Sequence, residues 1–265
     1  MSTETKVVVI TGASAGIGAA LARTLGAQGR QLVLAARRAS ELEAIAADSG
    51  SAALPVVTDV TRRKDVESLA ARALERFGQI DVWVNNAGRG ISRQVSELTD
   101  DDIDDMILVN VKSVLYGVQA VLPHFKSRKR GHIINISSML GRVPLAPFRS
   151  AYAASKHALN SLTANLRMEL RAQYPEIHVS TVSPGIVATD FGLNVRHGGV
   201  DSRSLPGAQS AEDVAAVITD VIARPRADAY TRPEMRQLVQ LYYGAEDMGA
   251  VETQPPFMPA TVRRK

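Results

Sequence analysis

Cysteine is absent from the 265-residue sequence, which therefore forms no disulfide and offers no thiolate to a metal ion. The five histidines are scattered without the spacing of metal ligands, so no metal site is expected. Long hydrophobic runs are also missing near the N-terminus. The apolar stretch 7–10 is too short for the core of a signal peptide and far below the roughly 18 residues of a membrane span. These absences predict a cytoplasmic protein that is neither exported nor inserted in a membrane.

Strong segregation of charge is missing as well. The net charge is +4 and the isoelectric point is about 9.5, yet the basic residues are interspersed with Asp and Glu along most of the chain. Only 126–130 and 263–265 are basic clusters, and such clusters are commonly helix ends or solvated tails. The sequence therefore predicts no nucleic-acid partner.

Short β-branched runs alternate with Ala- and Leu-rich helical stretches along most of the chain. The expected strands are 6–10, 31–36, 54–58, 80–87, 132–138 and 178–184. Alternating strands and helices predict right-handed crossovers and a buried parallel sheet. The expected fold class is α/β, a doubly wound, Rossmann-like parallel sheet in a single domain, 1–232, followed by a proline-containing tail, 233–265.

Glycines gather where the first expected strand meets the first helix. Gly12, Gly16 and Gly18 permit a tight turn whose backbone N–H groups can approach a diphosphate at the positive end of the helix. The spacing is Gly-x-x-x-Gly-x-Gly and not the Gly-x-Gly-x-x-Gly of the dinucleotide fingerprint. By itself the turn could equally be an ordinary glycine-rich connection between a strand and a helix that binds no ligand.

Tyr152 and Lys156 lie one helical turn apart on a background of small residues. Hydride transfer to a carbonyl requires a proton donor within hydrogen-bond reach of the oxygen. A Lys ammonium on the same helix face is expected to lower the pKa of the Tyr phenol, because opposite charge favours the ionised form. The pair is thus a candidate acid/base couple, although an exposed helix face could carry the same two residues.

Five motifs occur together and in order. They are the Thr-Gly-x-x-x-Gly-x-Gly turn, the sequence NNAG at 85–88, a Ser at the end of the fifth strand, the Tyr-x-x-x-Lys helix and the sequence PGIVAT at 184–189. Over roughly 5–230 the chain resembles the short-chain dehydrogenase/reductase family. The resemblance implies an oxidoreductase that binds a nicotinamide dinucleotide and acts on a small-molecule alcohol or carbonyl substrate.

The resemblance also implies roles for individual residues. The implied catalytic residues are Asn110, Ser138, Tyr152 and Lys156, with Lys156 also holding the nicotinamide ribose and Asn110 a water linked to Lys156. The implied cofactor contacts fall into four groups. At the diphosphate they are Gly12, Ser14, Gly16, Ile17 and Gly18, at the adenine Asp59 and Val60, and at the adenosine ribose Asn86, Ala87 and Gly88. The fourth group is Pro184, Gly185, Ile186 and Thr189, and within it Ile186 and Thr189 contact the nicotinamide.

The residues alone leave alternatives open for the roles of Ser138 and Asn110. Ser137 neighbours Ser138, and strand alternation puts the two on opposite faces. Gly141, three residues after Ser138, favours Ser138 because it matches the family's Ser-x-x-Gly pattern. Asn110 lies mid-helix among apolar residues, where its amide needs a partner, and a purely structural Asn bonded to backbone is the alternative.

The end of the second strand carries the cofactor prediction. An acid there would accept hydrogen bonds from the ribose 2′-hydroxyl of NAD, but the sequence has Arg37 and Arg38. A guanidinium can hold a 2′-phosphate through paired bonds, so NADP(H) is predicted, with Arg37 as the main contact.

The substrate is less well defined by the sequence. The glycine-rich segment 190–209 is interpreted as a mobile lid whose Arg196, His197 and Arg203 permit a substrate with an anionic end, and a solvated loop would look the same. The apolar helices 101–128 and 151–174 predict a homodimer or homotetramer. The alternative function is a dinucleotide-binding regulatory or scaffold protein of the same fold without turnover. A sugar-nucleotide epimerase is disfavoured, since no sizeable domain follows residue 230.

Overall fold

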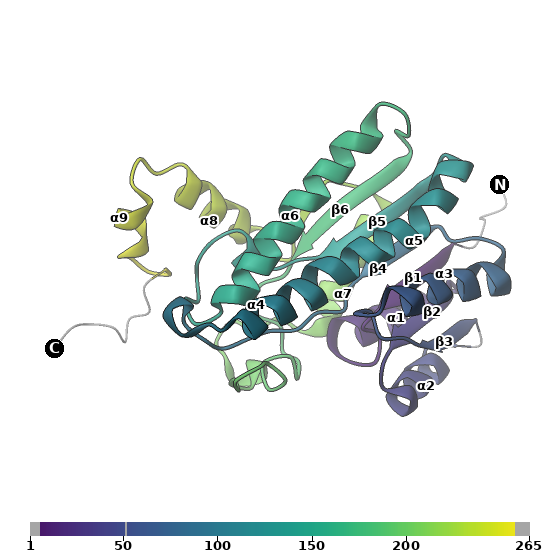
Figure 1. Cartoon of the computed structure of the whole chain (residues 1–265), viewed down its shortest axis with the longest axis horizontal. Coiled ribbons are helices and arrows are strands. Elements are labelled where there is room, and N and C mark those ends of the chain that lie inside the picture. Colours follow the sequence, from purple (N-terminus) through teal and green to yellow (C-terminus); the bar gives the residue numbers. More distant parts are fainter. Residues whose placement is uncertain (1–5, 51, 258–265) are drawn as a thin grey trace.

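A computed structural model describes residues 6–50 and 52–257, while 1–5, 51 and 258–265, which include the basic cluster 263–265, lie outside the described residues. One parallel sheet of seven strands has the order β3-β2-β1-β4-β5-β6-β7 (Figure 1). The strands are β1 (Val7–Thr11), β2 (Gln31–Ala36), β3 (Ala53–Val57), β4 (Val82–Asn85), β5 (Gly131–Ile136), β6 (Ile177–Ser183) and β7 (Asp228–Tyr230).

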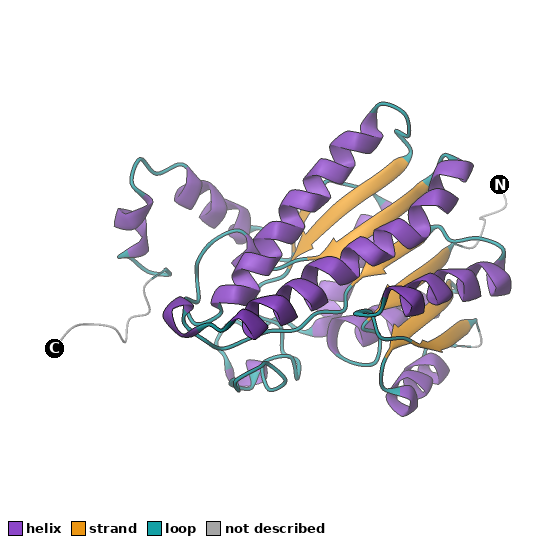
Figure 2. Ribbon diagram, in the orientation of Figure 1, coloured by secondary structure: helices purple, strands orange, loops and turns teal. Residues whose placement is uncertain are grey.

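Helices cover both faces of this sheet (Figure 2). One face packs against α1 (Gly16–Ala27), α2 (Ala39–Asp48) and α7 (Ala211–Ala223). The other packs against α3 (Arg63–Phe77), α5 (Ser113–Arg128) and α6 (Ser150–Arg171). The remaining elements are α4 (Asp100–Ile107), a π-helical turn (Leu108–Lys112), α8 (Glu234–Tyr243), α9 (Met248–Glu252) and three short 3₁₀ helices (Val95–Glu97, Met139–Gly141 and Ser202–Ser204).

The central strands are apolar on both faces because each face meets helices. In β1, Val8 and Ile10 belong to the core on the α1 side, whereas Val9 belongs to the core on the α3 side. Fully burying one such side chain contributes about 1.5 to 3 kcal/mol. This two-sided burial confirms the predicted doubly wound α/β fold.

The sheet has a topological switch point between β1 and β4. The chain leaves β1 toward β2 and β3 on one side and returns to β4 on the other, so the connections after β1 and β4 run to opposite sides. In open parallel sheets, ligands bind in the crevice beyond the carboxyl ends of the strands at such a point. The predicted site residues follow β1, β2, β3, β4, β5 and β6 at this carboxyl edge or lie on helices that begin there.

Regular structure continues beyond residue 232, in the segment that the sequence marks only as a proline-containing tail. The short strand β7 pairs in parallel with β6, and helices α8 and α9 follow it. Tyr242 and Phe257 are buried against Met139 and Val143, so the segment docks on the loop that follows β5. The surface on which the segment docks is supplied by a distant part of the chain.

The long helical run 100–128 is the one described segment that is apolar and long enough to cross a membrane, with a mean hydropathy of 1.4, yet half of its most apolar window is buried. Val121 and Phe125 of this run lie in the core beneath it, as in a core helix of the sheet. Its basic end is engaged within the fold, since Arg128 pairs with Asp81 at 3.0 Å.

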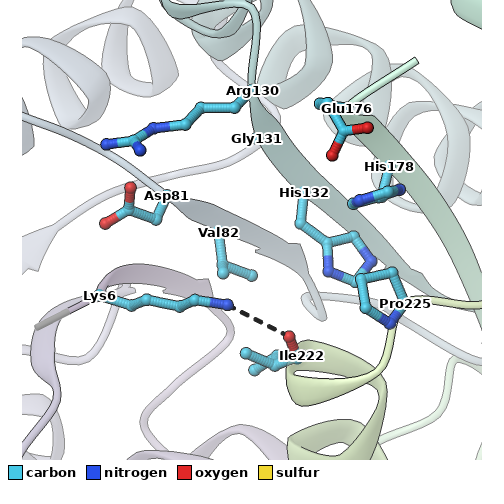
Figure 3. A pocket seen from close by; sticks show the side chains of 10 residues that line it. All are labelled: Lys6, Asp81, Val82, Arg130, Gly131, His132, Glu176, His178, Ile222 and Pro225. Atoms are coloured by element: carbon cyan, nitrogen blue, oxygen red, sulfur yellow. Dashed lines mark hydrogen bonds between the residues drawn. The ribbon is translucent and has the colours of Figure 1, made fainter. Parts of the chain in front are cut away.

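An open cavity of about 410 Å³ lies at the opposite edge of the sheet, where β1, β4, β5 and β6 begin (Figure 3). Lys6, His132 and His178 line it, and burial lowers the pKa of the His132 imidazole to about 3. Strands of five to seven residues separate this edge from the carboxyl edge by roughly 20 Å. The cavity is therefore distinct from the predicted catalytic edge.

Candidate active site

The turn between β1 and α1 has a backbone that only glycine accommodates easily. Gly12 and Gly16 have positive φ values of 68° and 54°. A Cβ at Gly18 would lie 2.3 Å from the Gly12 carbonyl oxygen, which is too close for any side chain. The turn thus keeps its backbone exposed at the positive end of α1, which fits a diphosphate group.

Thr11 and Asn86 hold this turn against the end of β4. The Thr11 hydroxyl accepts hydrogen bonds from the backbone N–H groups of Asn86 at 3.0 Å and Ala87 at 3.2 Å. In return, Asn86 Nδ2 donates to the carbonyl oxygens of Thr11 at 2.9 Å and Gly12 at 3.1 Å. The segment 86–88 is thereby fixed beside the glycine turn. Sequence reasoning assigned no role to Thr11, although its place in the Thr-Gly motif was a signal.

The end of β2 contributes two arginines with different surroundings. Arg38 donates to the Ser14 hydroxyl at 3.1 Å and pairs with Glu41 at 3.2 Å. Arg37 is exposed, and its charge helps to lower the pKa of the Asp59 carboxyl. That pKa is lowered although burial opposes the shift, because hydrogen bonds from Thr61 and the nearby arginines outweigh it. Val60 follows Asp59 and is half-buried.

Ser138 and Tyr152 meet at the carboxyl end of β5. The Ser138 side chain acts on the Tyr152 phenol, whose pKa it lowers, and its oxygen accepts the Leu140 N–H at 3.1 Å. The neighbouring Ser137 hydroxyl is buried and has no hydrogen-bond partner among the described residues. Of the two candidate serines, Ser138 is therefore the one that faces the tyrosine.

The electrostatics of Tyr152 differ from the sequence-based expectation. Lys156 Nζ donates to the Ile136 carbonyl oxygen at 2.8 Å and lies 5.8 Å from the Tyr152 ring centroid. Burial raises the pKa of the Tyr152 phenol, and Ser138 and the positive charge of Arg149 offset only part of that rise. Burial also lowers the pKa of Lys156 to about 8. Two cations therefore lie near Tyr152: Arg149, whose charge lowers the pKa of the phenol, and Lys156 beside the ring.

Asn110 lies in the π-helical turn between α4 and α5 and is completely buried. Its amide bridges three elements: Oδ1 accepts the Arg89 N–H at 2.9 Å, and Nδ2 donates to the Arg89 carbonyl at 2.9 Å and to Ser155 Oγ at 3.0 Å. Ser155 in turn donates to the Tyr152 carbonyl at 2.7 Å. Asn110 is thus bonded to the catalytic helix as well as to backbone, through Ser155, which sequence reasoning missed. Gly88 lies beside this network, since a Cβ there would be 3.2 Å from Asn110 Oδ1.

The segment after β6 closes the other side of the crevice. The Pro184 carbonyl accepts the Met139 N–H at 2.8 Å, which fixes 184–189 against the loop after Ser138. Gly185 and Ile186 are partly exposed, as contacts for a ligand must be. Thr189 packs near the glycine turn, because a Cβ at Gly16 would lie 3.2 Å from Thr189 Cγ2. Ile17, the next residue of α1, is half-buried at the same edge.

The segment 190–209 covers Tyr152. The Phe191 ring lies 5.7 Å from the Tyr152 ring, centroid to centroid. Arg196 donates its backbone N–H to the Gly90 carbonyl at 2.9 Å, and its carbonyl accepts the Ser92 N–H at 3.0 Å. The mobility predicted for this lid stays a prediction.

The lid cations are neutralised by acids of the fold. Asp102, fully buried at the start of α4, pairs with Arg196 at 2.8 Å, His197 at 2.8 Å and Arg93 at 3.0 Å. Burial opposes ionisation of Asp102, but these bonds outweigh it and hold the pKa of the carboxyl well below its usual range. Arg203 pairs with Asp190 and Asp201, both at 2.9 Å. Arg196, His197 and Arg203 therefore already have carboxylate partners in this arrangement, and an anionic end of the substrate stays a prediction.

Comparisons with known proteins agree with the geometry. A family model for short chain dehydrogenases matches residues 6–198. An uncharacterized oxidoreductase of Listeria monocytogenes is 38% identical over 238 residues, which cover 88% of this chain and 94% of the relative.

Two solved structures superpose on the chain. A short chain dehydrogenase/reductase of Burkholderia phymatum in complex with NAD has a TM-score of 0.85 at 30% identity, covering 98% of this chain and 99% of the other. An alcohol dehydrogenase of the archaeon Thermococcus sibiricus, complexed with 5-hydroxy-NADP, has a TM-score of 0.75 at 31% identity, covering 86% and 95%. The fold and the site define the class of doubly wound α/β oxidoreductases. Within that class, the chain belongs to the short-chain dehydrogenase/reductase family.

Proposed function

We propose that the protein is an NADP(H)-dependent oxidoreductase that interconverts a secondary alcohol and a ketone, with Tyr152 as the general acid and base. One observation carries the proposal: the Tyr152 phenol is buried beside Ser138 at the carboxyl edge of the sheet. A raised phenol pKa keeps Tyr152 protonated at neutral pH, which suits a proton donor for carbonyl reduction.

The side chains have separate roles in this proposal. Ser138 donates a hydrogen bond to the substrate oxygen, and that bond strengthens as negative charge develops on the oxygen. Tyr152 transfers its proton to this oxygen in reduction and removes it in oxidation. Lys156 stabilises the phenolate that remains, and Asn110 holds the helix through Ser155. A nicotinamide dinucleotide, when bound, supplies the hydride for reduction and accepts it for oxidation.

The glycine turn, the segment 86–88 and the segment 184–189 would hold this cofactor. Arg37 supports NADP(H) over NAD(H), because it is exposed beside the turn and no carboxylate among the described residues forms an ion pair with it, whereas Arg38 is engaged by Ser14 and Glu41. A regulatory or scaffold protein without turnover would have no need of a phenol buried beside Ser138, and this favours the enzyme.

The catalytic role is tested with Tyr152→Phe. Reduction of a panel of ketones is followed by the absorbance of NADPH, and cofactor binding by fluorescence titration. The variant should lose nearly all turnover and still bind NADPH, because only the hydroxyl is removed. More than about a tenth of the wild-type kcat on a good substrate would remove Tyr152 from this role.

The cofactor preference is tested with Arg37→Asp and with Arg38→Asp as its matched neighbour. Losing a charged phosphate contact should weaken NADPH binding about ten- to a hundredfold and leave NADH binding nearly unchanged. The effect should be smaller for Arg38. Equal wild-type affinities for NADH and NADPH would contradict the preference.

A homodimer or homotetramer is also proposed. Leu115 on α5 and Leu162 and Met168 on α6 are exposed apolar residues on neighbouring helices, and a second subunit would cover such a surface.

A further inference from the structure

Arg149 is a cation beside the catalytic tyrosine without an acidic partner in residues 6–50 and 52–257. It immediately precedes α6, three residues before Tyr152, and it is half-buried. Within the described residues its guanidinium makes one hydrogen bond, a long one from Nη1 to the Ile91 carbonyl at 3.4 Å, and it lies 5.4 Å from the Phe148 ring centroid. Burying part of a guanidinium is costly unless an anion compensates it.

The arginines of the lid and of the segment beneath it have such anions. Asp102 forms ion pairs with Arg93 and Arg196 and a hydrogen bond with His197, and Asp105 pairs with Arg89 at 2.9 Å. Arg203 has two carboxylate partners of its own. The fold therefore supplies acids to its surrounding arginines and leaves Arg149 for an anion from elsewhere.

The position of Arg149 indicates where that anion would sit. Arg149 lies three residues before Tyr152 at the start of α6, and its guanidinium bonds the carbonyl of Ile91, a residue that packs in one buried cluster with Tyr152. The lid passes over Arg149, because a Cβ at Gly199 would lie 3.3 Å from Arg149 Nη2. The positive end of the long helix α6 adds to the potential there. A substrate whose oxygen reaches Tyr152 would thus bring its neighbouring atoms to a cation covered by the lid.

We propose that Arg149 binds a carboxylate of the substrate close to the reacting carbonyl, so that the substrates are short keto acids and the corresponding hydroxy acids. This inference rests on the proposed oxidoreductase function. A guanidinium matches the planar carboxylate with two parallel bonds, which a lysine cannot reproduce. The specificity for an anionic end then comes from the helix of the catalytic tyrosine and not from the lid arginines.

The test compares each acid with its methyl ester: pyruvate, acetoacetate and levulinate, which vary the distance between the carbonyl and the carboxylate. Wild type should prefer at least one acid over its ester in kcat/KM, mainly through a lower KM. Arg149→Met should reduce that preference about ten- to a hundredfold, with a much smaller effect on the esters, and Arg149→Lys should retain part of it. Arg203→Gln, which removes a lid cation that already has partners, should leave the ratio of acid to ester unchanged.

Binding provides a second readout that does not require turnover. The preferred acid should raise the melting temperature of wild type in the presence of NADPH or NADP⁺, and the ester should not. The acid should no longer raise the melting temperature of Arg149→Met, and it should raise that of Arg149→Lys by part of the wild-type shift. Because Arg149→Lys keeps the positive charge, it serves as the variant in which a folding defect is least expected.

Each outcome bears on a different claim. If esters and neutral ketones are reduced and no acid is preferred, the Arg149 inference is wrong and the proposed function stands. If Arg149→Met lowers kcat/KM equally for the acid and its ester and shifts the pH profile of kcat, Arg149 acts only on the Tyr152 phenol. That result also overturns the inference. A changed ratio of acid to ester kcat/KM in Arg203→Gln would mean that the lid, and not Arg149, binds the carboxylate of the substrate, which overturns the inference. If no member of the panel is reduced while NADPH binds, the proposed function itself fails together with this inference.

Discussion

Replacing Thr11 by Val tests whether one buried hydroxyl joins the glycine turn to the end of β4. Val has nearly the same shape as Thr, so the change removes the hydroxyl without opening a cavity. The N–H groups of Asn86 and Ala87 then lose their acceptor at 3.0 and 3.2 Å. A fully buried donor without a partner costs about 1 to 3 kcal/mol. Both N–H groups belong to half-buried residues, so we take the lower end, about 2 kcal/mol for the pair.

The assay is urea unfolding followed by the fluorescence of Trp83, the only tryptophan of the chain. Trp83 is fully buried in β4, two residues before Asn85, and reports on the same strand end. The comparison needs equal protein concentrations, because an oligomer's stability depends on concentration. Thr11→Ser is the matched control, since it keeps the hydroxyl and loses one methyl group, worth about 0.8 kcal/mol.

We expect Thr11→Val to be less stable than Thr11→Ser, and to bind NADPH more weakly, because the segment 86–88 is released. A Val variant as stable as wild type, or more stable than the Ser variant, would refute the reasoning. That result would mean that water replaces the Thr11 hydroxyl at no cost, or that Asn86 Nδ2 alone holds the two segments together.

Three further predictions follow from the charges and surfaces of the fold. Asp102→Asn should loosen the lid, seen as faster proteolysis within 190–209 and a higher KM. Because the folded pKa of Asp102 is depressed, its stabilising effect is present above the unfolded pKa of about 4 and is lost as pH falls toward the folded value. Lys156→Met should lose turnover but gain stability at neutral pH, since burial lowers the pKa of this lysine to about 8. That gain should shrink as pH rises from about 8 toward 10.5, where the unfolded lysine also loses its proton. Light scattering at micromolar concentration should show a dimer or tetramer, and Leu162→Glu should reduce its mass; a wild-type monomer would contradict the proposed interface.

The sequence by itself determined the class of the fold and the edge of the sheet at which the predicted site residues lie. Alternation of apolar strands with amphipathic helices leaves few arrangements other than a doubly wound parallel sheet, because both faces of each strand must be buried. The glycine turn was predictable from local sterics, since Gly12 and Gly16 need a positive φ. Motif order also brought the predicted residues to one edge, because the carboxyl ends of parallel strands meet there.

Only the tertiary structure decided how charges pair across that edge. Arg196, His197 and Arg203 look as available in the sequence as Arg149, but the acids that neutralise them come from α4 and from the lid itself. The same holds for Tyr152, whose pKa depends on burial, Ser138 and Arg149 more than on the lysine one turn away. It holds as well for the segment 234–257, which docks on Met139 and Val143. Such pairings depend on distances between residues far apart in the chain, and local patterns of side chains carry no information on those distances.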